Sequence, residues 1–235
     1  VDGVRLVFPP DIEPGTLQSL ATEADAIVGW RPDEELLAAA RRLKLFVNPG
    51  AGVQHLLPRF RKRFTEHGVV LVNGHGNAGF TAQHAVALLL ALTNHVVRHD
   101  SWMRQGRWRT GDTEARSIPL RGRTIGLLGY GHVNQQVHLL LSSFDVTFAL
   151  LRRECNDADD PMPTPAARFG PTELHLFLER VDVLVVALPE TDDTRGLIKA
   201  RELKLLGPTG LLVNVGRGPV VDEEALYLAL KERTI

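Results

Sequence analysis

One stretch, residues 124–151, constrains the fold of this chain more than any other. It contains a short apolar run, a turn bearing Gly129 and Gly131, a segment of helical periodicity and a second apolar run. This order is typical of a βαβ unit. The first glycine permits a tight turn, and the second lets backbone N–H groups approach a pyrophosphate at the N-terminus of the helix. The stretch therefore predicts a dinucleotide site on a parallel sheet.

The glycine pattern is incomplete, because Asn134 stands where the third glycine of G-x-G-x-x-G is expected. That glycine normally allows close packing of helix against strand. An asparagine there predicts a wider gap or a polar contact. The motif alone is a weak signal, and an ordinary strand–turn–helix is the alternative.

Composition excludes several other classes of protein. The chain has 235 residues, of which 44% are apolar and 23% charged, and a net charge of −1. These values are ordinary for a globular protein and give no sign of a nucleic-acid surface. The longest apolar run, residues 85–92, is too short to span a bilayer. The single Cys155 cannot form an internal disulfide, so we expect a cytoplasmic protein.

Both ends of the sequence indicate that the chain is a fragment of a longer protein. It begins at Val1 without an initiator methionine, and it stops at Ile235, just after a helix that should lead into another strand.

We expect the first lobe, residues 1–78, to be a smaller α/β domain. Its alternating pattern predicts a parallel sheet covered on both faces. The expected strands are residues 4–8, 26–29, 45–47 and 69–72, and the expected helices are residues 17–22, 36–43 and 60–67.

The second lobe, residues 79–235, is expected to be the doubly wound nucleotide-binding domain. It would open with one long, buried apolar helix, residues 81–99, and an arm, residues 100–120, in which Trp102 and Trp108 are packing anchors. The Pro-rich residues 160–171 are predicted to form a surface loop. The expected strands are residues 125–128, 146–151, 183–188 and 211–215. Asp222 is the expected N-cap of a helix over residues 223–232.

Ligands of such a sheet bind at the carboxyl ends of the strands where the winding reverses. With a strand order 3-2-1-4, the fourth strand ends at Val215, which brings Arg217 opposite the Gly129 turn. An arginine between two glycines can bind a carboxylate with both arms of its guanidinium. A surface arginine in a turn is the alternative.

The second strand of this lobe ends in Arg152 and Arg153, about twenty residues beyond the glycines. A site selective for NAD carries an acidic residue there for the ribose hydroxyls, and none is present. Two arginines can instead pair with a 2′-phosphate. We therefore expect NADP(H) to be preferred, with NAD(H) as the alternative.

Several motifs together resemble the D-isomer-specific 2-hydroxyacid dehydrogenases, in particular glyoxylate and hydroxypyruvate reductases. They run along nearly the whole chain and are PGAGV at residues 49–53, GRW at 106–108, GYGHV at 129–133, LPETDDTRGLI at 188–198 and VNVGRGPVVD at 213–222. The resemblance implies a Rossmann nucleotide-binding domain, a flavodoxin-like substrate domain and hydride transfer between NAD(P)H and a small 2-oxo or 2-hydroxy acid of the D series. It also implies a homodimer formed through the long helix and arm.

The same resemblance assigns roles to individual residues. Arg217 is similar to the substrate-orienting arginine, and Asn77 to an asparagine that formate-type members use on substrate. The substrate set, to which we add the strand-end histidine His75, is Ala51, Gly52, Val53, His75 and Asn77. The cofactor set is Gly129, Tyr130, Gly131, His132, Val133, Arg152, Arg153, Leu188, Pro189, Thr194, Val215 and Gly216. Gln83 departs from the family, which usually has Glu at that place.

Reduction of a carbonyl by hydride leaves an alkoxide that needs a proton, which a histidine paired with a carboxylate usually supplies. In the family this Glu and His follow the part that resembles residues 1–235, so we expect the chain by itself to turn over poorly. His95 and His99 have the i, i+4 spacing of a zinc helix but lack the adjacent Glu, and we assign no metal. Alternatives are a non-catalytic dinucleotide sensor similar to transcriptional corepressors, and a formate-type dehydrogenase.

Overall fold

The computed structural model describes residues 3–108, 115–153 and 162–235. The chain divides into two compact units, Val1–Asn77 and Ala78–Ile235. The division lies one residue before the boundary expected from the sequence. Each unit is described by itself below.

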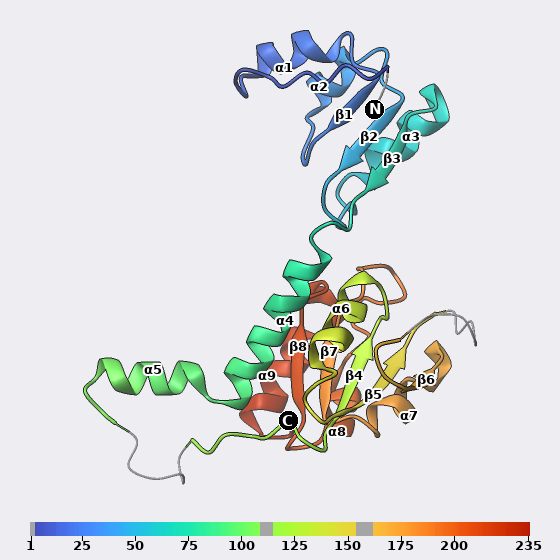
Figure 1. Cartoon of the computed structure of the whole chain (residues 1–235). Helices are drawn as coiled ribbons and strands as arrows, with labels where there is room; N and C mark the ends of the chain where they lie inside the picture. The colour runs from blue at the N-terminus through green and yellow to red at the C-terminus, as the bar shows by residue number, and fades with distance from the viewer. Residues whose placement is uncertain (1–2, 109–114, 154–161) are drawn as a thin grey trace. The chain divides into compact units, whose positions relative to one another are not determined.

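Unit 1 is built on a three-stranded parallel sheet of order β1-β2-β3 (Figure 1). The Asp33 side chain caps α2 by accepting from the backbone N–H of Leu36, and Gly68 ends α3 with a φ of 70°. The elements are α1 Pro14–Ala21, β1 Ala26–Val28, α2 Glu34–Ala39, β2 Leu45–Asn48, α3 Leu57–His67 and β3 Val70–Asn73.

Within unit 1, the described residues cover only one face of this sheet. Ile27, Phe46 and Leu71 are register partners on the covered face, where the ring of Phe46 lies 5.0 Å from that of Phe60. Side chains of the neighbouring residues point to the opposite face. There Val28 is 69% exposed and Val70 44% exposed. The expectation of a sheet covered on both faces is therefore wrong for this unit.

The strand expected at residues 4–8 is also wrong. This segment is irregular, and its apolar side chains lie in solvent, with Phe8 84% exposed and Leu6 76% exposed. An apolar run becomes a strand only when a neighbouring strand receives its backbone N–H and C=O groups. In this structure β1 pairs directly with β2, and residues 4–8 pair with no described strand.

Unit 2 is a five-stranded parallel sheet of order β6-β5-β4-β7-β8. Helices α4 and α6 cover one face, and α7, α8 and α9 cover the other (Figure 1). Strand β7 is buried on both faces along its whole length. The strands are β4 Thr124–Leu128, β5 Thr147–Leu151, β6 Ala166–Phe169, β7 Val183–Val186 and β8 Leu211–Asn214. The helices after the arm are α6 His132–Leu141, η1 Pro171–Glu173, α7 Leu174–Leu178, α8 Ala200–Leu206, η2 Gly218–Val220 and α9 Glu223–Lys231.

Strand β6 corrects the prediction of a surface loop over residues 160–171, of which residues 160 and 161 lie outside the described part of the chain. It is a short edge strand whose strand partner is β5. Its presence makes β8 the fifth strand of the sheet rather than the fourth. The predicted cap of α9 is confirmed, because the Asp222 side chain accepts from the backbone N–H of Ala225.

The single helix expected at residues 81–99 is in fact two helices, α4 Ala78–Thr93 and α5 Val96–Arg104, bent by 64°. The chain breaks at His95, whose φ of 50° is left-handed and incompatible with a continuing helix. No single described helix is long and apolar enough to cross a membrane, and only the bent pair passes that test of length and composition.

In the arm, the guanidinium groups of Arg98 and Arg107 contact the Trp102 ring, 4.9 and 4.4 Å from its centroid. Trp108 is 72% exposed, so its expected role as a packing anchor is wrong.

Candidate functional site

The β4–α6 turn is open at the N-terminus of α6. Gly129 adopts a φ of +85°, which side chains rarely tolerate, and Gly131 has no heavy atom within 4 Å of where a Cβ would lie. The N-cap residue of α6, Gly131, makes no side-chain cap hydrogen bond, and both Gly131 and His132 are exposed. A helix N-terminus attracts anions because its first N–H groups have no partner within the helix. This end of α6 is therefore shaped to receive a phosphate.

Three of the predicted cofactor residues meet at this edge of the sheet. A Cβ at Gly129 would lie 2.7 Å from Leu188 Cδ2, and one at Gly216 would lie 2.6 Å from the Leu188 carbonyl oxygen. These three residues follow β4, β7 and β8, so the carboxyl ends of those strands converge. The backbone supports the same convergence, since Ala187 N–H donates to Leu128 O and Val215 N–H donates to Val186 O, both at 3.0 Å.

Asn134 makes the polar contact that the sequence predicted as one of two outcomes. It is fully buried, and its Nδ2 donates to Gly129 O at 2.8 Å and lies 3.3 Å from both Leu128 O and Val185 O. Its Oδ1 is buried without a partner among the described residues. The side chain thus occupies the helix–strand gap that a third glycine would close.

His138 belongs to a buried network that the sequence reasoning missed. One turn of α6 after Asn134, its Nδ1 lies 2.8 Å from the Tyr130 hydroxyl and its Nε2 lies 2.8 Å from Thr164 Oγ1. Its ring contacts that of Phe148, with the centroids 4.0 Å apart and the planes tilted by 38°. Burial lowers the pKa of His138 to about 4, so the imidazole is neutral at pH 7. The available signal was the i, i+4 spacing of Asn134 and His138 on one helix face.

Arg152 and Arg153 follow β5, directly beside the glycine turn. The backbone N–H of Gly129 donates to Leu151 O at 2.9 Å, and that of Arg152 donates to Phe169 O at 3.2 Å. The Arg153 guanidinium lies 4.0 Å from the Asp193 carboxylate, with both side chains largely exposed. The structure therefore brings the two arginines to the edge of the sheet that carries Gly129.

Arg217 sits in a turn organised by Asn214. The Asn214 Oδ1 accepts from Gly216 N–H, and its Nδ2 donates to Arg217 O, both at 3.0 Å. The Arg217 guanidinium donates back to Gly216 O at 2.8 Å. Because β8 is the fifth strand, the end of β7 lies between this turn and Gly129, which corrects the expected position opposite the glycines.

The loop after β7 is held together by Thr194, which is 9% exposed. Its hydroxyl donates to Pro189 O at 2.6 Å and accepts from Thr191 N–H at 2.8 Å. The hydroxyl is thus used within the loop. Contact of Pro189 and Thr194 with a cofactor stays a prediction.

In unit 1, the predicted substrate loop is held by two asparagines at strand ends. The fully buried Asn48 donates from Nδ2 to Gly50 O, and Asn73 donates from Nδ2 to Ala51 O at 3.0 Å. Since Asn48 and Asn73 are register partners, the loops after β2 and β3 lie at one edge of the sheet. The predicted residues Ala51, Gly52 and Val53 occupy the first loop, and the exposed His75 and Asn77 follow β3.

The sequence carried a signal for these asparagines that our reasoning missed. Strands β2, β3 and β8 read LFVN, VLVN and LLVN, so each apolar run ends in an asparagine. An amide can both donate to and accept from the loop that follows, as Asn214 does.

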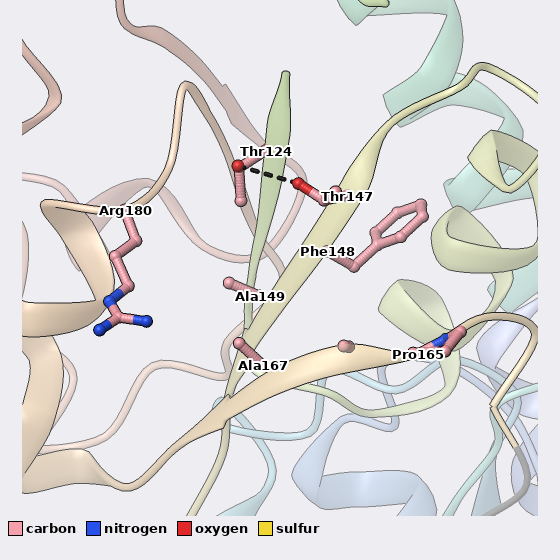
Figure 2. Close-up of a pocket in the computed structure, with 8 residues that line it drawn as sticks. Thr124, Thr147, Phe148, Ala149, Pro165, Ala167 and Arg180 are labelled. Carbon is pink, nitrogen blue, oxygen red and sulfur yellow. Dashed lines mark hydrogen bonds between the residues drawn. The ribbon is translucent and has the colours of Figure 1, made fainter. Parts of the chain in front are cut away.

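A cavity of about 560 Å³ lies at the opposite, amino ends of β4, β5 and β6 (Figure 2). Thr124 and Thr147, whose hydroxyls lie 3.0 Å apart, and the exposed Arg180 line it. None of the predicted site residues lines this cavity. It is therefore separate from the site at the carboxyl ends of the strands.

Comparison with known proteins identifies relatives of this chain by sequence and by structure. Residues 86–235 match the family model described as D-isomer specific 2-hydroxyacid dehydrogenase, NAD binding domain. The chain is 34% identical to a glyoxylate reductase of Aeropyrum pernix over 233 residues, which covers 95% of this chain and 67% of that protein. It is 32% identical to a glyoxylate reductase of Pyrococcus furiosus, with 89% of this chain and 63% of that protein covered.

Among solved structures, the chain resembles an NADPH-dependent glyoxylate/hydroxypyruvate reductase of Sinorhizobium meliloti in complex with NADP and malonate. The TM-score is 0.72 at 33% identity, covering 89% of this chain and 63% of that one. The chain thus spans about two thirds of the length of these relatives. The glycine turn, the Leu188 loop and the Arg217 turn all lie within the matched residues 86–235. The chain belongs to the D-isomer-specific 2-hydroxyacid dehydrogenase family.

Proposed function

We propose that unit 2 binds NADP(H) at the carboxyl edge of its sheet and that NAD(H) binds there more weakly. The observation that carries this proposal is the open, uncapped N-terminus of α6 beside Gly129 and the two arginines that follow β5. The helix end would receive the pyrophosphate, and Arg152 and Arg153 would bind the 2′-phosphate through charge-assisted hydrogen bonds.

The reaction we propose is reduction of a small 2-oxo acid to the D-2-hydroxy acid, in which the cofactor supplies the hydride. Arg217 would bind the substrate carboxylate and polarise its carbonyl group. The guanidinium stays protonated at neutral pH, so the alkoxide must receive its proton from another group. In unit 1, the loop residues Ala51, Gly52 and Val53, with His75 and Asn77, are proposed to contact the substrate.

The names of the relatives support a substrate class of glyoxylate or hydroxypyruvate size. These three relatives are all named as reductases, which favours an enzyme over a non-catalytic sensor. We also propose a cytoplasmic homodimer. Support for the dimer is the set of large apolar side chains exposed on α4 and α5, which includes Phe80, Val97 and Met103.

The cofactor proposal is tested by titrating NADPH and NADH into the chain and following nicotinamide fluorescence. We expect NADPH to bind more tightly, and the substitution Arg152→Asp to reverse that order. Arg180→Asp is the matched control, because it makes the same charge change at the amino ends of the strands (Figure 2). Equal affinity for the two cofactors in the unsubstituted chain would refute the preference for NADP(H), and no binding of either would refute the site.

A further inference from the structure

The glycine turn after β4 is anchored from beneath by two polar side chains of α6. Asn134 and His138 lie one helical turn apart, and both are fully buried. Polar side chains are rarely placed in a helix–sheet interface without partners. Both of these side chains are directed to the same three-residue turn, Gly129 to Gly131.

Asn134 fixes the first peptide of that turn. Its Nδ2 donates to Gly129 O at 2.8 Å. In a trans peptide the C=O and the following N–H point in opposite directions, and the described chain has no cis peptide bond. The Tyr130 N–H is therefore turned away from the Asn134 side chain.

The Asn134 amide has only one workable orientation. Reversing it would bring Oδ1 close to the carbonyl oxygens of Leu128, Gly129 and Val185. The observed orientation leaves Oδ1 buried without a partner among the described residues. A buried unsatisfied oxygen costs stability. The side chain is thus better explained by the conformation it imposes on the turn than by stability.

His138 fixes the second residue of the turn. Tyr130 is 7% exposed, and its hydroxyl lies 2.8 Å from His138 Nδ1. The other ring nitrogen lies 2.8 Å from Thr164 Oγ1. A neutral imidazole offers one donor and one acceptor, and two hydroxyl groups can complement either tautomer. The network therefore ties the turn to α6 and to the segment before β6.

We propose that Asn134 and His138 are positioning residues that hold the turn at Gly129, Tyr130 and Gly131 in the form that receives the pyrophosphate of the cofactor. This inference rests on the proposed function. It assigns to two side chains the task that close helix–strand packing performs when a third glycine is present.

The test compares affinity for NADPH with affinity for adenosine 2′-phosphate, which lacks the pyrophosphate, by calorimetry on the full chain. Tyr130→Phe removes one hydroxyl from the network, and Asn134→Ala removes the amide. We expect each to weaken NADPH by about tenfold, the value of one hydrogen bond, and to leave adenosine 2′-phosphate within about twofold. His138→Gln, which keeps a donor and an acceptor, should retain more NADPH affinity than His138→Phe.

Tyr227→Phe is the matched control, because Tyr227 is the chain's other tyrosine and is 57% exposed on α9. It should change neither affinity. If the unsubstituted chain binds no NADPH, the proposed function fails instead. If NADPH affinity is unchanged in Tyr130→Phe, or falls equally for both ligands, the positioning role is wrong. Should Asn134→Ala not fold, Tyr130→Phe still decides the outcome.

Discussion

The two units of this chain use the same alternation of strands and helices but cover their sheets differently. In unit 1 the β1-β2-β3 sheet is packed on one face, and Val28, Val70 and Val72 lie exposed on the other. In unit 2 the sheet is packed on both faces, and β7 is buried throughout. The strands themselves are similarly apolar, VLVN in β3 against VLVV in β7. Apolar strands thus indicate where a sheet forms, and the helices that pack on it decide how much is buried.

The difference also bears on the two predicted binding regions, one in each unit. In unit 2 the ligand edge is supported by a five-stranded sheet and by buried polar contacts beneath the glycine turn. In unit 1 the substrate loop depends on Asn48 and Asn73 at the end of a sheet with one open face. We therefore expect unit 1 to be the less stable of the two, because less apolar surface is removed from water.

The largest effect is expected from removing a buried aromatic ring from the core of unit 1. Phe46→Ala should cost about 3–5 kcal/mol, because Phe46 is fully buried against Phe60. Hydrogen exchange should show loss of protection in β1, β2 and β3 and none in β4 and β7. Phe177→Ala, in the fully buried core of unit 2, is the converse control. Joint loss of protection in both units would contradict separate stabilities.

The next largest effect is a pH dependence of the stability of unit 2. The folded pKa of His138, about 4, is below its unfolded value of 6.5, so the unfolded chain binds the extra proton between these values. The contribution of the neutral ring to the free energy of unfolding is at its full value above pH 6.5. It falls by about 3 kcal/mol in total as the pH falls toward 4. Urea unfolding at several pH values measures this slope.

The matched variant is His138→Phe, which has no titrating ring at this position. Its free energy of unfolding should depend less on pH, even though the variant is less stable. His132→Gln changes an exposed histidine of the same helix and should leave the slope as it is. A slope that persists in His138→Phe would show that other groups cause it.

The smallest effect concerns the loop after β7. Thr194→Val keeps the shape of the side chain but leaves Pro189 O and Thr191 N–H without their partner. We expect a loss of about 1–2 kcal/mol, seen as faster hydrogen exchange across residues 189–197. Thr191→Val alters the exposed neighbour and should cost less. Equal costs would mean that the buried hydroxyl does not organise the loop.

Much of unit 2 could be predicted from sequence because its signals are local. Gly129 and Gly131 marked the turn before α6, Asp222 marked the start of α9, and the arginines after β5 lay at the predicted edge. Each of these depends on a few adjacent residues. The motifs that resemble the family lay in the same loops, which is why family and fold were both predicted correctly.

Other features depended on which segments pack together. The break at His95 was hidden by an apolar run that suits a continuous helix, and β6 by prolines that suit a loop. Residues 4–8 have the composition of a strand but no partner strand in the described chain.

The sequence by itself determined the alternation of elements, the glycine turn and the family, because backbone conformation at glycines and caps is set by neighbouring residues. Only the tertiary structure decided which faces are covered and what Asn134 and His138 do. Their partners, such as Val185 for Asn134 and Thr164 for His138, lie 51 and 26 residues away in the chain. A hydrogen bond across such a separation forms only once the sheet and its helices have packed.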